Sequence, residues 1–167
     1  MENYENRIVL FLDILGFKRI INETVFKEKG QKEREDSSKT QFLIETINEM
    51  TFIANQTHKE TTKSVTQFSD SIVISFVEND EKEIPKLFHN LQRLISSLLA
   101  KEILCRGAIS YGKLYHRNNL IFGPALVDAY ETESKAALYP RVILDSSIFE
   151  VMKYNYTLEY KHQYRII

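Results

Sequence analysis

The chain has 167 residues, 22 Lys and Arg against 23 Asp and Glu, and a formal net charge of −1. This length predicts one domain over residues 1–167 that buries a core without disulfides or structural zinc, and the single Cys105 excludes an internal disulfide. The balanced charge argues against a dedicated nucleic-acid binder, and the lack of a ~20-residue apolar run or a signal peptide predicts a soluble, cytoplasmic protein.

The N-terminal segment predicts a strand, a turn and a helix in that order. Residues 7–12 (RIVLFL) form a nearly continuous apolar run rich in β-formers, as in a central strand buried on both faces. Asp13 stands at the C-terminal end of this strand, and Gly16 breaks it. Apolar residues then recur at helical spacing, which predicts a helix over residues 17–26.

A charged stretch and a second helix precede a hairpin. Residues 27–39 (KEKGQKEREDSSK) are almost wholly charged or polar and indicate a solvated loop. Residues 39–56 carry apolar side chains on one helical face, namely Leu43, Ile47, Met50 and Ala54. Two β-rich segments, 63–68 and 71–77, are separated by two residues only, which predicts a tight hairpin with Asp70 at its tip.

The second half of the chain repeats this alternation of helices and strands. A leucine periodicity predicts a helix over residues 84–101, and residues 104–111 form a strand-like segment. Residues 112–119 indicate a turn-rich connection. Pro124 opens a predicted helix that ends near residue 138, and residues 141–144 form a further strand closed by the polar Asp-Ser-Ser sequence.

The order of elements predicts an α+β fold with a ferredoxin-like (palm-type) antiparallel sheet, helices packed on it and one extra helix. Residues 154–167 alternate apolar and polar groups, as an edge strand or hairpin does. The histidines lack partners at metal-ligand spacing, so we expect surface roles for all of them: His58, His89, His116 and His162.

Two carboxylates far apart in the sequence meet at one edge of this predicted sheet. Asp13 ends the first strand and Asp70 tips the neighbouring hairpin, so the pair forms a candidate site for hard divalent ions that act on a phosphoryl group. Gly16 permits close backbone approach, and the first amides of the next helix, at Phe17 and Lys18, suit a phosphate. The alternative is that Asp13 caps that helix and Asp70 is a turn residue.

Four segments occur in the order of a known family. They are FLDILGF (11–17), FSDSIVISF (68–76), RGAISYG (106–112) and FGPAL (122–126). Their order resembles that of the class III nucleotide cyclase catalytic domain. Together with AYETESKAALYPRVILD (129–145), the set is most similar to the pyrimidine nucleotide cyclases of bacterial Pycsar anti-phage systems.

This resemblance implies a two-metal reaction. Asp13 and Asp70 would carry two Mn²⁺ or Mg²⁺ ions, and the carbonyl of Ile14 would ligate one of them. The triphosphate would be held by the residues that follow, Leu15, Gly16 and Phe17. The implied chemistry is attack of the ribose 3′-hydroxyl on the α-phosphate with release of pyrophosphate.

Departures from the purine cyclases bear on the choice of base. At the two base-selecting positions this chain has Thr66 and Leu120, which lack the charged groups of adenine and guanine pockets. A pyrimidine is therefore favoured, with UTP preferred to CTP. Val127 and Glu131 stand where the purine enzymes have the Asn and Arg that contact ribose and transition-state charge.

Other cations must then stabilise the transition state. Arg141 is the catalytic candidate, Arg106 is a candidate substrate ligand, and Lys161 is a further possibility. The alternatives are an ion pair for Arg106 and a bond to a helix-end carbonyl for Arg141. Tyr130 is expected in the core or an interface, with base or ribose contact as its alternative.

The resemblance also implies partners. It predicts a head-to-tail homodimer with sites at the interface, in which Thr66 and Leu120 of one subunit face the metal acids of the other. It implies a separate effector, of transmembrane or TIR type, activated by cyclic UMP or cyclic CMP in anti-phage defence. Two other functions stay open, namely a catalytically degenerate nucleotide-binding module and a purine (adenylate or guanylate) cyclase.

Overall fold

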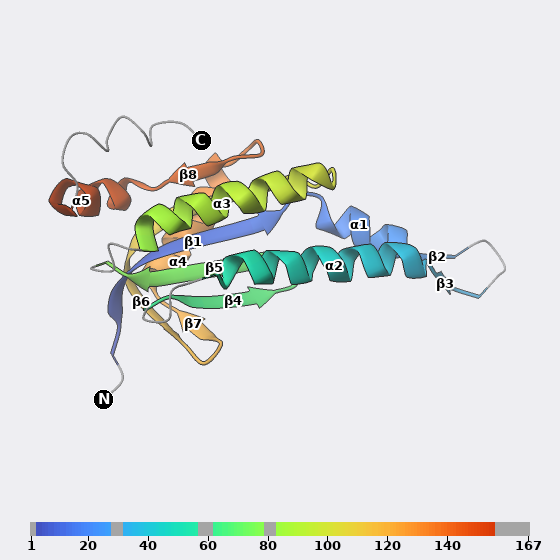
Figure 1. The fold of residues 1–167 in the computed structure, drawn as a ribbon, viewed down its shortest axis with the longest axis horizontal. Helices are drawn as coiled ribbons and strands as arrows, with labels where there is room; N and C mark the ends of the chain where they lie inside the picture. Colours follow the sequence, from blue (N-terminus) through green and yellow to red (C-terminus); the bar gives the residue numbers. More distant parts are fainter. Residues whose placement is uncertain (1–2, 28–31, 57–61, 79–82, 156–167) are drawn as a thin grey trace.

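The computed structural model describes residues 3–27, 32–56, 62–78 and 83–155. Figure 1 shows a sheet with helices on both faces. The elements in chain order are β1 (Glu5–Ile14), α1 (Phe17–Thr24), β2 (Val25–Phe26), β3 (Arg34–Glu35), α2 (Ser37–Ala54), β4 (Ser64–Phe68), β5 (Ser71–Val77), α3 (Glu83–Ala100), β6 (Cys105–Arg117), β7 (Leu120–Phe122), α4 (Pro124–Ala136), β8 (Val142–Leu144) and α5 (Ser146–Asn155).

The main sheet has the strand order β4-β5-β1-β6-β7, and all of these neighbours are antiparallel. β8 also joins β6, but in parallel, because α4 carries the chain back along the sheet before β8 begins. The α+β fold with an antiparallel sheet and packed helices is thus confirmed. A separate two-stranded hairpin, β2–β3, projects beyond α1 and α2 (Figure 1).

The central strand β1 divides the core into two layers. Its even-numbered apolar residues, with Ile14 at the end, pack under α2 and α3, which lie side by side across one face (Figure 1). Val9 and Phe11 point to the other face, which α4 covers through Ala125 and Ala129. Because both faces are covered, the predicted continuous apolar strand is confirmed, and each fully buried Leu or Ile contributes about 1.5–3 kcal/mol.

The predicted solvated loop ends earlier than expected. The β3 strand lies inside it, and α2 begins at Ser37 rather than at residue 39. The cause is a helix cap, because the Asp36 carboxylate accepts hydrogen bonds from the amides of Ser38 (3.1 Å) and Lys39 (3.2 Å). Residues 28–31 of the predicted loop lie outside the described residues. The first helix likewise ends two residues early, at Thr24.

The turn-rich connection predicted over residues 112–119 is wrong for most of its length. β6 continues to Arg117, and its buried Leu114 and His116 maintain the alternation of a strand. The chain reverses only at Asn118 and Asn119, which both have positive φ (51° and 65°) and thereby form a two-residue hairpin turn before β7. The predicted strand end at Gly112 is wrong because this residue lies inside β6, where it pairs with Arg7 of β1.

The C-terminal region holds a helix that the sequence analysis missed. Asp145 does not merely close a strand, because its Oδ1 accepts a hydrogen bond from the Ser147 amide (2.9 Å) and so begins α5. The predicted edge strand over residues 154–167 is therefore wrong at Tyr154 and Asn155, which end α5. Its remaining residues, 156–167, lie outside the described residues.

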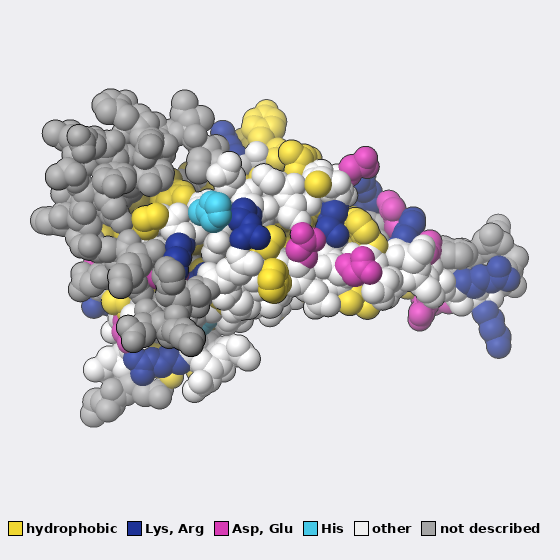
Figure 2. Space-filling view, in the orientation of Figure 1, with side chains coloured by type: hydrophobic (Ala, Val, Ile, Leu, Met, Phe, Trp, Pro, Cys, Tyr) yellow, Lys and Arg dark blue, Asp and Glu magenta, His cyan; other side chains and the backbone are white. Residues whose placement is uncertain are grey.

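The surface carries charges of both signs. On the face drawn in Figure 2, basic and acidic side chains are interspersed over the helices rather than gathered into a field of one sign. Among the described helices, none combines the length and apolar character that crossing a membrane requires.

Candidate active site

The structure brings Asp13 and Asp70 to the same end of the sheet. Asp13 is the penultimate residue of β1 and pairs with Ser71 of β5, while Asp70 occupies the turn just before Ser71. The Ile14 amide donates to the Asp70 carbonyl oxygen (3.3 Å), which fixes that turn against β1. The Asp13 carboxylate accepts a hydrogen bond from Ser71 Oγ (2.8 Å).

The surroundings of Asp13 shift the pKa of its carboxyl group. Burial raises the pKa of Asp13 above its usual value, and the nearby negative charges of Asp70 and Glu133 raise it further. The hydrogen bond from Ser71 and the charge of Arg106 lower this pKa, but they do not cancel the rise. A half-buried carboxylate with a second carboxylate nearby is suited to a bound cation.

The donor set is compatible with Mg²⁺ or Mn²⁺. Such ions prefer oxygen ligands and are commonly held by one or two carboxylates together with water and substrate phosphates. Asp13 and Asp70 supply that number. Within the described ranges, no three His, Cys, Asp or Glu side chains are grouped so that they would enclose a metal without a substrate.

The start of α1 lies directly beyond this acidic pair. Gly16 precedes the helix in the left-handed conformation (φ 74°), which glycine adopts without strain, and it offers no side chain to cap the helix. Asp13 is therefore not the cap of α1, and that alternative is wrong. The Leu15 amide donates to the Leu104 carbonyl (2.8 Å) and the Arg19 amide donates to the Gly16 carbonyl (2.8 Å), so the amides left at the start of α1 are those of Phe17 and Lys18.

Arg106 lies beside Asp13 but already has a partner. Arg106 is the strand-register partner of Asp13 in the β1–β6 pair. Its ion pair is with Glu133 on α4, where Arg106 Nε contacts Glu133 Oε1 without the alignment of a hydrogen bond. Glu133 is 2% exposed and Arg106 is 28% exposed. The structure therefore shows Arg106 in an ion pair, which is the alternative to a substrate ligand.

Arg141 precedes β8 at the same end of the sheet. The register of β8 on β6 places it two strands away from β1. Its Nη2 donates to the Ala136 carbonyl at the end of α4 (2.7 Å), and its guanidinium lies 6.0 Å from the ring centroid of Tyr139. The structure thus shows the alternative for Arg141, which is a hydrogen bond to a carbonyl at a helix end. Lys161 lies outside the described residues.

One aromatic and one acidic residue of α4 also have partners. Tyr130 is exposed and packs edge-to-face on Phe11 (5.7 Å between ring centroids). Glu131 pairs with Lys135 one helical turn further on.

The two positions expected to select the base lie on β4 and β7. Thr66 is half-buried on β4, and Leu120, 56% exposed, opens β7 opposite Arg117. Asp13 pairs with Arg106 near the start of β6, whereas Leu120 pairs with Arg117 at the end of β6, so the two residues lie at opposite ends of this strand.

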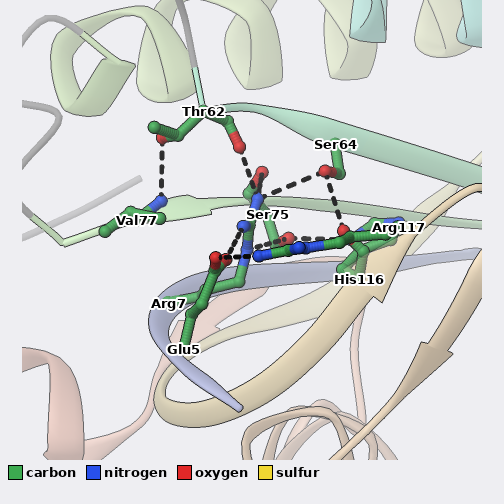
Figure 3. A network of polar contacts seen from close by, with 8 residues as sticks. All are labelled: Glu5, Arg7, Thr62, Ser64, Ser75, Val77, His116 and Arg117. Carbon is green, nitrogen blue, oxygen red and sulfur yellow. Dashed lines mark hydrogen bonds and ion pairs between the residues drawn. The ribbon is translucent and has the colours of Figure 1, made fainter. Parts of the chain in front are cut away.

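A buried polar network joins β1, β4, β5 and β6, and the sequence analysis missed it (Figure 3). His116, expected on the surface, is 2% exposed, so that expectation is wrong for this residue. Its ring contacts Ser75 and Thr66. Burial lowers its pKa to about 4, and the charge of Arg7 acts in the same direction. The alternation of Leu114 and His116 along a continued strand would have revealed it.

The other histidines do not change the site. His89 is exposed on α3, as expected, while His58 and His162 lie outside the described residues.

Comparison with known proteins identifies the fold. No family model matches the chain, and no curated protein matches it. Among solved structures, the adenylyl cyclase CyaB from P. aeruginosa matches with a TM-score of 0.57 at 18% identity, over 93% of this chain and 84% of that chain. A bacterial light-regulated adenylyl cyclase matches with a TM-score of 0.59 at 16% identity, over 93% and 83%. The chain has the fold that these two cyclases share.

Proposed function

We propose that the chain is a nucleotide cyclase that converts a nucleoside triphosphate into the 3′,5′-cyclic nucleotide and pyrophosphate. The observation that carries the proposal is the pairing of Asp13 and Asp70 at one sheet end, beside the start of α1. The fold shared with two adenylyl cyclases supports it, because those proteins are named for this class of reaction.

In this proposal Asp13 and Asp70 hold two divalent ions, Mn²⁺ or Mg²⁺, with the Ile14 carbonyl as a further ligand. When bound, the ions would neutralise charge on the triphosphate and promote attack by the 3′-oxygen. Ser71 holds the Asp13 carboxylate in one orientation through its 2.8 Å hydrogen bond. Gly16 lets the triphosphate approach the backbone, and the first amides of α1 bind its oxygens.

The reaction forms a bond between the ribose 3′-oxygen and the α-phosphorus. It breaks the bond from the α-phosphorus to the bridging oxygen of the β-phosphate, and the 3′-hydroxyl proton passes to solvent. Arg141 and Arg106 are the proposed cations for transition-state charge. Arg106 lies beside Asp13, but it must also neutralise the buried Glu133, which limits how far it can turn toward a substrate.

We further propose a pyrimidine substrate, UTP or CTP. Thr66 and Leu120 offer a hydroxyl and an apolar side chain where a purine pocket would use charged contacts. The separation of Leu120 from Asp13 supports a head-to-tail homodimer, in which each base pocket is completed by the other subunit. A separate effector that responds to the cyclic nucleotide in anti-phage defence completes this proposal, on the resemblance in sequence alone.

The test is an assay with Mn²⁺ and each of ATP, GTP, CTP and UTP, with cyclic products identified by mass spectrometry. The proposal predicts one cyclic pyrimidine, which Asp13→Asn and Asp70→Asn both abolish. Asp128→Asn is the matched control, because it makes the same substitution at an exposed position on α4. Cyclic AMP or cyclic GMP as the main product would refute the pyrimidine assignment. No product from any nucleotide would favour a degenerate binding module.

A further inference from the structure

Four buried or half-buried side chains form a linear series of hydrogen bonds across the sheet, and Figure 3 draws the first three of them, Arg7, Ser75 and His116. Arg7 Nε donates to Ser75 Oγ (2.9 Å), Ser75 Oγ contacts His116 Nδ1 (2.7 Å), and His116 Nε2 contacts Thr66 Oγ1 (2.8 Å). The series begins at β1 and ends at Thr66 on β4, the position proposed to contact the base.

The chemistry of the first residue fixes the direction of the whole series. Arginine only donates, so Ser75 Oγ must accept from Arg7. Ser75 is 0% exposed, and in the described part of the chain its hydroxyl contacts only Arg7 and His116. Its proton therefore goes to His116 Nδ1, because the opposite arrangement would bury an unsatisfied hydroxyl hydrogen.

The same reasoning passes through the imidazole to Thr66. A neutral histidine that accepts at Nδ1 carries its proton at Nε2, so His116 donates to Thr66 Oγ1. Burial and the charge of Arg7, which lower the pKa of His116 to about 4, keep the ring neutral at pH 7. Thr66 Oγ1 thus accepts from within the protein, and among the described residues no acceptor is found for its own hydrogen, which is therefore available to a ligand.

We propose that His116 is a positioning residue for base selection, which fixes the Thr66 hydroxyl as a hydrogen-bond donor toward an acceptor atom of the nucleotide base. This inference rests on the proposed function, and it names the recognition chemistry of that pocket. A carbonyl oxygen or an unprotonated ring nitrogen satisfies the Thr66 donor. A base that presents an amino group or a ring N–H at that point is disfavoured, because the hydroxyl can accept from it only through its second lone pair, which leaves the Thr66 hydrogen without an acceptor.

A first experiment tests the direction without any activity. Long-range ¹⁵N–¹H correlation spectra of the wild-type protein at pH 7 report which imidazole nitrogen carries the proton. We expect His116 to be protonated at Nε2 only. A ring protonated at Nδ1, or at both nitrogens, would overturn the proposal even if every variant failed to fold.

A second experiment measures the ratio of kcat/KM between the preferred base and the next best base. His116→Phe removes the donor to Thr66, and Thr66→Val removes the hydroxyl while keeping the shape, so each lowers the ratio about five- to tenfold. His116→Gln retains an N–H donor and should keep most of the discrimination. Ser64→Ala is the matched control. Ser64 donates to the backbone carbonyl of His116 (3.1 Å) and accepts from Arg7 Nη2 (3.3 Å), but it contacts neither the imidazole nor Thr66, so the ratio should stay within about twofold.

The outcomes separate this inference from the proposed function. A ratio unchanged in His116→Phe, with all nucleotides slowed equally, would assign His116 a structural role only and overturn the inference while the cyclase assignment stands. No cyclic product from the wild type with any nucleotide would overturn both together. Loss of discrimination in His116→Phe and Thr66→Val, with retention in Ser64→Ala, supports the proposal.

Discussion

Replacing Arg106 tests whether the cation beside Asp13 is structural or acts on the substrate. Arg106→Leu leaves the carboxylate of Glu133, 2% exposed, without its counter-charge. Removing one partner of a buried ion pair costs about 3–5 kcal/mol, and because Arg106 is 28% exposed we expect the lower figure of about 2–3 kcal/mol. For a chain of 167 residues this lowers the Tm by about 5–10 °C.

The measurement is urea unfolding at pH 7 in the presence of EDTA, followed by circular dichroism. Arg106→Leu combined with Glu133→Leu removes both charges, so its free energy of unfolding should return to within about 1 kcal/mol of the wild type. Arg19→Leu is the matched control, because Arg19 is 84% exposed and its pair with Glu23 contributes less than about 0.5 kcal/mol.

Two results would refute this reasoning. The first is a single variant no less stable than the Arg19→Leu control, and the second is a double variant as unstable as Arg106→Leu. Turnover in the same proteins then assigns the role of Arg106. Recovery of activity in the double variant means that Arg106 acts by neutralising Glu133, whereas loss in both variants means that it contacts the substrate.

Further predictions concern the acids, His116 and Cys105. Asp13→Asn and Asp70→Asn should each lower turnover at least about 100-fold, measured by cyclic-nucleotide yield, and equal yields would contradict the two-metal roles. In metal-free protein the pKa of Asp13 is raised, so the contribution of its neutral form to stability is complete below about pH 3.8 and is lost as the pH rises through the folded-state pKa. The free energies of unfolding of the wild type and Asp13→Asn, measured by urea titration, should therefore converge toward low pH. A difference that does not change with pH would refute the shift. The contribution of neutral His116 is complete above about pH 6.5 and is lost as the pH falls toward 4, so His116→Gln should flatten the pH dependence of stability in that window; an unchanged slope counts against it. Burial raises the pKa of the Cys105 thiol to about 11, and the charge of Asp13 acts in the same direction. Its reaction with a disulfide reagent at pH 8 should therefore be at least about 100-fold slower in native than in urea-unfolded protein. Fast labelling of the native protein would contradict the burial of Cys105.

The elements that the sequence predicted well are those with a strong local pattern. The apolar run of β1, the two-residue spacing between β4 and β5, and the leucine periodicity of α3 each specify one local conformation. The positions of Asp13 and Asp70 followed from these elements, since a strand end and a hairpin tip fix where a side chain lies. The elements missed are β2, β3, β7 and α5. The three strands have only two or three residues, too few to show a periodicity, and α5 begins at a polar Asp-Ser-Ser sequence that suits either a turn or a helix cap.

Local pattern thus determined that the chain forms strands, helices and a tight hairpin, and that two carboxylates stand at their ends. Only the tertiary structure decided which distant side chains meet. The pairing of Arg106 with Glu133, the burial of His116 between Ser75 and Thr66, and the parallel addition of β8 all depend on strand register and on α4 folding back over the sheet. Such contacts join residues far apart in the chain, so the periodicity of one segment, which reports only its own conformation, carries no record of them.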